Sequence, residues 1–97
     1  MTIEYHPAVQ PELEEVRQFY EGQLPGLGWE FIDEFERQAL RIASTPLHWM
    51  VVNGDVRRCL MKRFPYIIYF RQVGPERIRI TVVKHARRHP RFGRNRA

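Results

Sequence analysis

The residues best suited to chemistry lie in two short stretches of the second half of the chain. The first stretch, VRRCLMKRF, carries Arg58 and Lys62, and the second, VKHARRH, carries His85 and Arg88. An imidazole titrates near neutral pH, so His85 is the best candidate for moving a proton. Guanidinium and ammonium groups bind phosphate oxygens, and arginine can do so with two parallel hydrogen bonds. If the two stretches lie side by side, these four side chains converge on one concave site for a phosphate-bearing substrate.

The distribution of charge favours a polyanionic partner. Residues 1–56 hold three arginines against ten acidic residues, a balance of −7, whereas residues 57–97 hold thirteen Lys and Arg against Glu76 alone, a balance of +12. A basic region of this kind attracts either nucleic acid or an acidic protein. We therefore expect a surface that binds RNA or a partner protein beside the candidate site. Its expected members are Arg63, Arg87, His89, Arg91 and Phe92.

Each of these residues also has a purely structural interpretation. His85 at the end of a strand could hydrogen-bond a neighbouring backbone group and fix the segment that follows it. Arg63 could be a solvated strand residue or an ion-pair partner of the acidic helices. Arg91 could belong to a flexible tail that attracts phosphates or contacts a partner. The residue types alone leave both interpretations open.

Composition removes several other classes of function. Cys59 is the only cysteine, so an internal disulfide is impossible, which suits a reducing cytoplasm. The histidines and the cysteine lack the spacing of metal ligands, and nothing implies a cofactor. No run of eighteen apolar residues exists and the N-terminus has no secretory signal, so we expect a cytoplasmic protein without a membrane segment.

The first half of the chain predicts a strand followed by two helices. Residues 2–6 alternate like a short strand, and apolar residues then recur at helical spacing from the Pro7–Pro11 region to the Pro25-Gly26 turn. A second amphipathic helix is expected from Leu27 to Ser44, antiparallel to the first. Residues 47–55 are expected to form a connector.

The second half predicts a sheet. Strands are expected at residues 56–64, 66–71 and 77–85, with the alternation of Ile78, Ile80 and Val82 directed at the core. The expected fold is α+β, in the order β-α-α-β-β-β, with the helical hairpin on a mostly antiparallel sheet of about four strands. We expect one domain, residues 1–97, with a basic tail from about residue 90 to 97. The expected core is Phe19, Phe31, Phe35 and Ile42 against Leu60, Ile68, Phe70, Ile80 and Val82.

Two long motifs in this sheet region are similar to a known family. The run V-R-R-x-L-x-K-R-F-P-Y-I-I-Y-F from Val56 to Phe70, and the run R-I-T-V-V-K-H-A-R-R-H-P from Arg79 to Pro90, resemble the RelE/ParE superfamily of type II toxin–antitoxin modules. The resemblance covers essentially the whole chain. It implies a small basic toxin that a cognate antitoxin wraps with an acidic and apolar segment.

The resemblance implies two alternative activities on the same fold, of which we expect mRNA cleavage at the ribosome, with inhibition of DNA gyrase as the alternative. RelE-like members act on the ribosome and cut mRNA without a metal, through the ribose 2′-hydroxyl, whereas ParE-like members inhibit DNA gyrase. For RNA cleavage the expected catalytic residues are His85 for proton transfer and Lys62, Arg88 and Arg58 for the phosphate charge. Many RelE-like nucleases have a tyrosine near the C-terminus, and this chain has Phe92 there. A third alternative is an RNA-binding module without toxicity.

Overall fold

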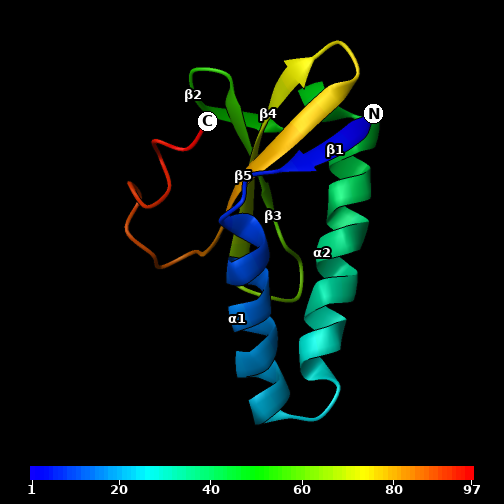
Figure 1. Cartoon of the computed structure of the whole chain (residues 1–97), viewed down its shortest axis with the longest axis vertical. Helices are drawn as coiled ribbons and strands as arrows, with labels where there is room; N and C mark the ends of the chain where they lie inside the picture. Colours follow the sequence, from blue (N-terminus) through cyan, green and yellow to red (C-terminus); the bar gives the residue numbers. More distant parts are fainter.

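The computed structural model describes residues 1–97 and confirms the expected α+β fold (Figure 1). An N-terminal strand, β1 (Thr2–Tyr5), is followed by helices α1 (Val9–Gln23) and α2 (Leu27–Ser44) and a short 3-10 turn, η1 (Pro46–His48). The remaining strands are β2 (Met50–Asn53), β3 (Val56–Leu60), β4 (Tyr66–Gly74) and β5 (Arg77–His85). None of the helices combines the length and apolar composition that crossing a bilayer requires.

The strands form one five-stranded sheet in the order β1-β5-β4-β3-β2. β1 runs parallel to β5, and all other neighbours are antiparallel. The fifth strand, β2, lies in the segment expected to be a connector. It forms because the tight turn at Gly54 and Asp55, with Gly54 at φ 56°, folds the short apolar run Met50–Asn53 back onto β3.

The helical hairpin is closed by a single carboxylate at its tip. Glu21 accepts hydrogen bonds from the backbone N–H groups of Gly26 (2.7 Å) and Gly28 (3.0 Å), which lie at the start of α2. Gly28 packs so closely on α1 that a Cβ atom there would lie 2.3 Å from the carbonyl oxygen of Arg17. The two helices therefore approach each other closely at this end.

The core lies between α2 and the inner face of the sheet. Phe31 and Ile42 of α2 are fully buried against Ile68, Phe70 and Ile80. The complete buried cluster is Val9, Phe31, Phe35, Ala39, Ile42, Ala43, Cys59, Met61, Phe64, Ile68, Phe70, Ile78, Ile80 and Val83. Burial raises the pKa of the Cys59 thiol to about 11, which makes this cysteine a packing residue.

Three residues expected in the core lie elsewhere. Phe19 is 59% exposed and Leu60 is 56% exposed, because each points away from the packed interior. Val82 is buried but lies on the outer face of the sheet, and Val83 takes the expected place in the core. The cause is a β-bulge. Tyr69 pairs with Val82 and the next residue, Phe70, pairs with Ile80, so Thr81 is an extra residue in β5 and the facing of the strand reverses there.

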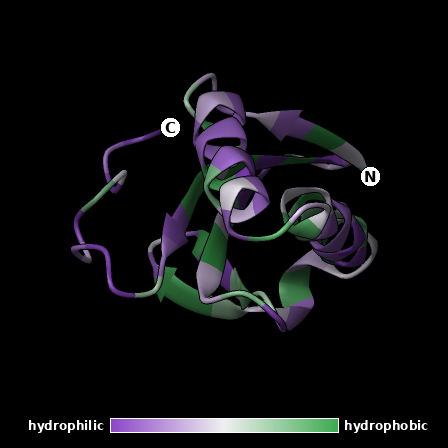
Figure 2. Cartoon of the chain, turned by 90° about the horizontal axis from the view of Figure 1, so that it is seen from below, coloured by the Kyte–Doolittle hydropathy of each residue, from purple (hydrophilic) through white to green (hydrophobic).

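Residues 86–97, called the C-terminal segment below, turn away from β5 and return along the outer face of the sheet. In Figures 1 and 2 this segment runs on the opposite side of the sheet from α2, and Figure 2 shows it as mostly hydrophilic. The expected basic tail is therefore in contact with the sheet.

The core assignment predicts unequal costs for two phenylalanine truncations. Phe31→Ala should lower the free energy of unfolding by about 3–5 kcal/mol, because it leaves a cavity beside Phe64 and Tyr66. Phe19→Ala, in the exposed position, should cost no more than about 1 kcal/mol. Urea denaturation of both variants measures this, and equal costs would contradict the packing described here.

Candidate functional site

The predicted site residues lie in three places rather than one. Arg58 lines a groove on the outer face of the sheet. His85 and Arg88 line a separate hollow beside α1. Lys62 and Arg63 belong to the loop between β3 and β4, which is held against α2. The two sequence stretches are not adjacent strands, because β3 and β5 flank β4 on opposite sides.

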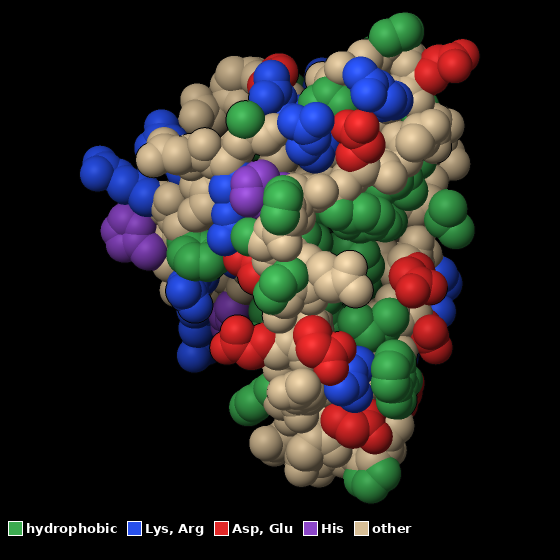
Figure 3. Space-filling model, viewed as in Figure 1, with side chains coloured by type: hydrophobic (Ala, Val, Ile, Leu, Met, Phe, Trp, Pro, Cys, Tyr) green, Lys and Arg blue, Asp and Glu red, His purple; other side chains and the backbone are tan.

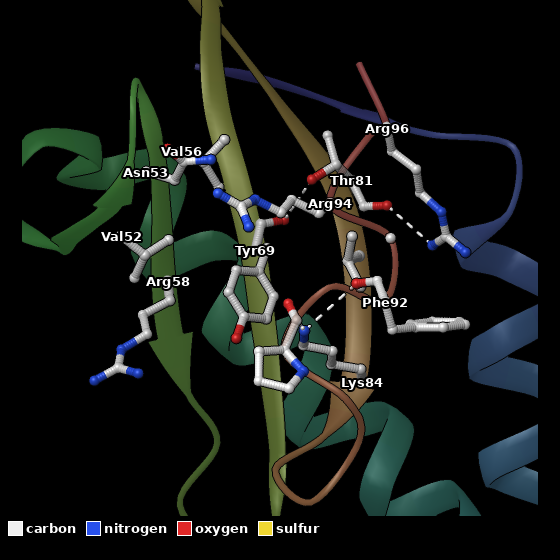
Figure 4. Close-up of a pocket in the computed structure, with 13 residues that line it drawn as sticks. Val52, Asn53, Val56, Arg58, Tyr69, Thr81, Lys84, Phe92, Arg94 and Arg96 are labelled. Carbon is white, nitrogen blue, oxygen red and sulfur yellow. Dashed lines mark hydrogen bonds between the residues drawn. The ribbon is translucent and has the colours of Figure 1, made fainter.

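The outer groove lies between the β2–β3 hairpin and the C-terminal segment and has a volume of about 330 Å³ (Figure 4). Strand residues form its floor and one wall, and the C-terminal segment forms the other wall. Its lining residues are Val52, Asn53, Val56, Arg58, Tyr69, Thr81, Val82, Lys84, Pro90, Phe92, Gly93, Arg94 and Arg96. The bulge at Thr81 turns Val82 and Lys84 towards this groove.

Lys84 anchors the C-terminal segment. Its buried ammonium donates to the carbonyl oxygens of His89 (3.3 Å), Pro90 (3.0 Å) and Phe92 (3.4 Å) and lies 4.9 Å from the centre of the Tyr69 ring. Desolvation by burial lowers the pKa of Lys84. Because its donors are occupied by backbone carbonyls, this lysine has a structural role.

An ion pair fixes the end of the C-terminal segment. The guanidinium of Arg96 lies 2.8 Å from the carboxylate of Glu12 on α1 and also donates to the carbonyl oxygen of Thr81 (3.2 Å). Gly93 has φ 74° and lies so near β5 that a Cβ atom would approach Val82 to 2.6 Å. The segment is thus held at both ends and in the middle.

The hollow beside α1 contains His85. Nδ1 of His85 accepts a hydrogen bond from the backbone N–H of Arg87 (3.0 Å), and the ring meets Tyr66 edge-on at 5.2 Å. A neutral imidazole has one donor and one acceptor nitrogen, so its proton lies on Nε2 when Nδ1 accepts. Burial is the main cause that raises the pKa of Tyr66. In this arrangement the neutral ring of His85, which lines the hollow, carries its donor on Nε2.

The same hollow mixes acidic, basic and aromatic side chains. Glu12 and Glu15 of α1 line it together with Arg88, whose guanidinium lies 4.0 Å from the centre of the Phe92 ring. Carboxylates this near to the basic groups make the hollow a less favourable place for a phosphate than a purely basic site. Phe92 and Lys84 line both hollows.

The β3–β4 loop is braced by the buried carboxylate of Glu34. This carboxylate accepts hydrogen bonds from the backbone N–H groups of Lys62 (2.7 Å) and Arg63 (3.2 Å). The Arg63 side chain pairs with Glu30 at 2.7 Å, and that hydrogen bond raises the pKa of Arg63. Arg63 is therefore an ion-pair partner of the acidic helix α2, which is the second of the two structural interpretations that the sequence left open.

The remaining predicted residues, Arg87, His89 and Arg91, are exposed on the C-terminal segment. His89 repeats the geometry of His85, since its Nδ1 accepts from the N–H of Arg91 (3.1 Å). Figure 3 shows acidic side chains mainly over the far end of the helical hairpin and basic ones mainly over the sheet and the C-terminal segment. No group of three His, Cys, Asp or Glu side chains is arranged to hold a metal ion.

Sequence reasoning missed most of the groove residues, including Tyr69, Lys84 and Arg94. Tyr69 lies in the expected strand 66–71, and its alternation with Ile68 and Phe70 places it on the opposite face of the sheet from the core. Lys84 occupies an outward position only because of the bulge. Arg94 offered no periodic signal, since it lies beyond the last strand.

Comparison with known proteins points to one family. A family model described as "ParE toxin of type II toxin-antitoxin system, parDE" matches residues 3–90. Among solved structures, a chain titled "Chromosomal ParDE TA system from P. aeruginosa" superposes with a TM-score of 0.75 at 16% identity, covering 88% of this chain and 95% of that chain. No curated protein matches the sequence.

The two glutamates that meet the β3–β4 loop give a matched test of how it is held. Glu34→Ala should cost about 1.5–3 kcal/mol, because it removes a buried charged acceptor from two backbone N–H groups. Glu30→Ala, one helical turn earlier, removes only an exposed ion pair and should cost less than about 1 kcal/mol. Chemical denaturation distinguishes the two, and a larger loss for Glu30→Ala would contradict the assignment.

Proposed function

The chain belongs to the ParE family of toxins from type II toxin–antitoxin systems, and on that premise we propose that it acts by inhibiting DNA gyrase rather than by cutting mRNA. ParE-like toxins, as the family resemblance implies, act as protein-binding inhibitors. Membership in a ParDE system also implies an antitoxin partner.

The observation that carries this proposal is the state of His85. RNA cleavage through the 2′-hydroxyl needs a base with a free lone pair. Nδ1 of His85 accepts the N–H of Arg87, so in the neutral ring the proton lies on Nε2. A ring held in this way can donate a hydrogen bond, but it must change its tautomer or its partner before it can accept a proton.

The distribution of cations supports the same proposal. Phosphoryl chemistry without a metal needs several positive groups around one phosphate. Arg58 and Arg88 line different hollows, and the Lys62 backbone is tied to Glu34 on α2. Glu12 and Glu15 line the same hollow as Arg88 and His85. This arrangement suits contacts with a protein surface better than a nuclease centre.

The alternative is ribosome-dependent mRNA cleavage of the RelE type. It requires the ribosome to assemble the separated basic residues around the message and to release His85 from Arg87. The residues involved would be His85, Lys62, Arg88 and Arg58. A test of function therefore has to include translating ribosomes as well as gyrase.

We expect the purified protein to stop gyrase from supercoiling relaxed plasmid while a message in a reconstituted translation reaction stays intact. His85→Ala should leave gyrase inhibition unchanged, because inhibition of gyrase by binding does not require His85 to transfer a proton. The readouts are plasmid topology on a gel and primer extension on the message. New cuts that appear only with ribosomes present, and that His85→Ala abolishes, would replace the proposal with the nuclease alternative.

A further inference from the structure

The two edges of the sheet differ in how they are protected from contact with another chain. β1 and β2 form its opposite margins (Figure 1). On β1, Glu4 is held by Arg77 and Arg79, and charged side chains of this kind keep an edge from pairing with a foreign strand. β2 has the sequence MVVN, which contains no charged residue and no proline. It therefore lacks the residues that most often protect an edge strand.

The outward backbone groups of β2 have no partner within the chain. β2 pairs only with β3, and none of the backbone hydrogen bonds outside the helices and strands involves residues 50–53. Val52 is in addition an extra residue that no residue of β3 opposes. All four residues of the strand are exposed. A further strand at this edge would supply the missing hydrogen-bond partners.

Apolar side chains are concentrated around the same edge. Eleven large apolar side chains are exposed in the chain, and five of them lie between residues 47 and 60, namely Leu47, Met50, Val51, Val52 and Leu60. Both faces of β2 contribute to this cluster. Val51 lines a hollow together with Phe70 of the core face, whereas Val52 lines the outer groove and Met50 lies beside Arg58 on that outer face. Contiguous exposed apolar surface is typical of an interface with another protein.

We propose that two copies of this chain pair through β2, antiparallel and around a twofold axis, so that their five-stranded sheets form one continuous sheet. Residues directly opposite each other in an antiparallel pair lie on the same face. An axis beside Val51 meets this condition, because it places Val51 against its own counterpart and Met50 against Val52 of the second copy. Met50 and Val52 both lie on the outer face. The strand is thus self-complementary, as an interface between identical copies requires.

The charges near β2 are compatible with this pairing. The strand itself is neutral, and the arginines beside it, Arg57 and Arg58, lie on β3. The two β3 strands of the dimer are three strand spacings apart, about 14 Å, which exceeds the Debye length of about 8 Å at physiological salt. The repulsion between two copies of net charge +5 therefore falls as salt is added. A polyanion is a poorer occupant of this edge, because β2 offers it no cation.

The short strand predicts a weak dimer, because standard interfaces bury about 1,200–2,000 Å² and an edge of four residues buries less. We expect analytical ultracentrifugation of the purified chain to show a monomer–dimer equilibrium between about 1 μM and about 1 mM. The dimer fraction should rise with added salt, since salt screens the repulsion between the copies. A monomer at every concentration would overturn the proposal, and so would dissociation of the dimer by salt.

A substitution at the axis tests the contact with a matched control. Val51→Lys should weaken dimerisation by at least about tenfold, because it removes an apolar contact from each copy and places two like charges opposite each other. Leu40→Lys makes the same kind of change at a residue of α2 that is 64% exposed, and it should leave the dimer unchanged. Thermal melting shows whether both variants are folded. Equal effects of the two substitutions would contradict pairing through β2.

A disulfide locates the axis directly. Val51→Cys should cross-link to its own counterpart under air oxidation, because directly opposed residues of antiparallel strands have Cβ atoms about 4.5–5.5 Å apart, near the distance that a disulfide spans. The native Cys59 is buried, so the unchanged chain should not cross-link. Leu40→Cys provides a second control and should stay monomeric on a non-reducing gel. Cross-linking at position 40 but not at position 51 would refute the proposed axis.

Hydrogen–deuterium exchange distinguishes a second copy from the antitoxin as the occupant of this edge. We expect the backbone amides of residues 50–53 to become protected as the concentration of the chain alone rises. Protection that appears only after a cognate antitoxin is added would assign the edge to the antitoxin and overturn the proposal. None of these readouts involves gyrase or the ribosome, so each of them tests the dimer separately from the proposed function.

Discussion

The extra residue at Thr81 is the constraint on which both faces of the sheet depend. A strand with strict alternation would direct Val82 inward and leave Val83 outside. The bulge reverses the alternation at one position, so Ile78, Ile80 and Val83 all reach the core. Beyond the bulge it also turns Val82 and Lys84 outward, where the first meets Gly93 and the second binds three carbonyl oxygens of the C-terminal segment. One inserted residue thus seals the interior and creates the anchor for the outer layer.

The carboxylates in the acidic first half of the chain mainly hold other segments of the molecule in place. Its carboxylates are largely used inside the molecule: Glu12 holds Arg96, Glu34 holds the β3–β4 loop, and Glu21 closes the helical hairpin. The arginines that remain without an acidic neighbour are concentrated on the sheet and the C-terminal segment. The outer face is therefore basic because its arginines remain unpaired after the carboxylates have formed their contacts inside the molecule. These arginines are available to a binding partner.

The sequence was sufficient for the parts of the fold that follow a regular period. The bounds of α2 and β5 agree with those expected, because both elements carry apolar residues at a sustained spacing and end at clear turn signals. The sequence did not predict β2, because its four residues are too few to show the alternation of apolar and polar residues that is typical of a strand. The prediction that Val82 lies in the core was wrong, because the alternation of residue types along β5 gives no sign of the bulge at Thr81. The path of the C-terminal segment depends on Lys84, Gly93 and Arg96 contacting residues far away in the chain, which no local pattern reveals.

The pairing of the first strand with the last has a consequence for how the protein is made. β1 joins the sheet only through β5, with Thr2 beside Arg77 and Tyr5 beside Ile80. Closing so long a loop is entropically costly, and contacts of such sequence separation slow folding. During synthesis the N-terminal strand has no partner until nearly the whole chain has left the ribosome. Copies of this toxin that terminate before Arg77 lack the only partner of β1 and therefore cannot complete their sheet.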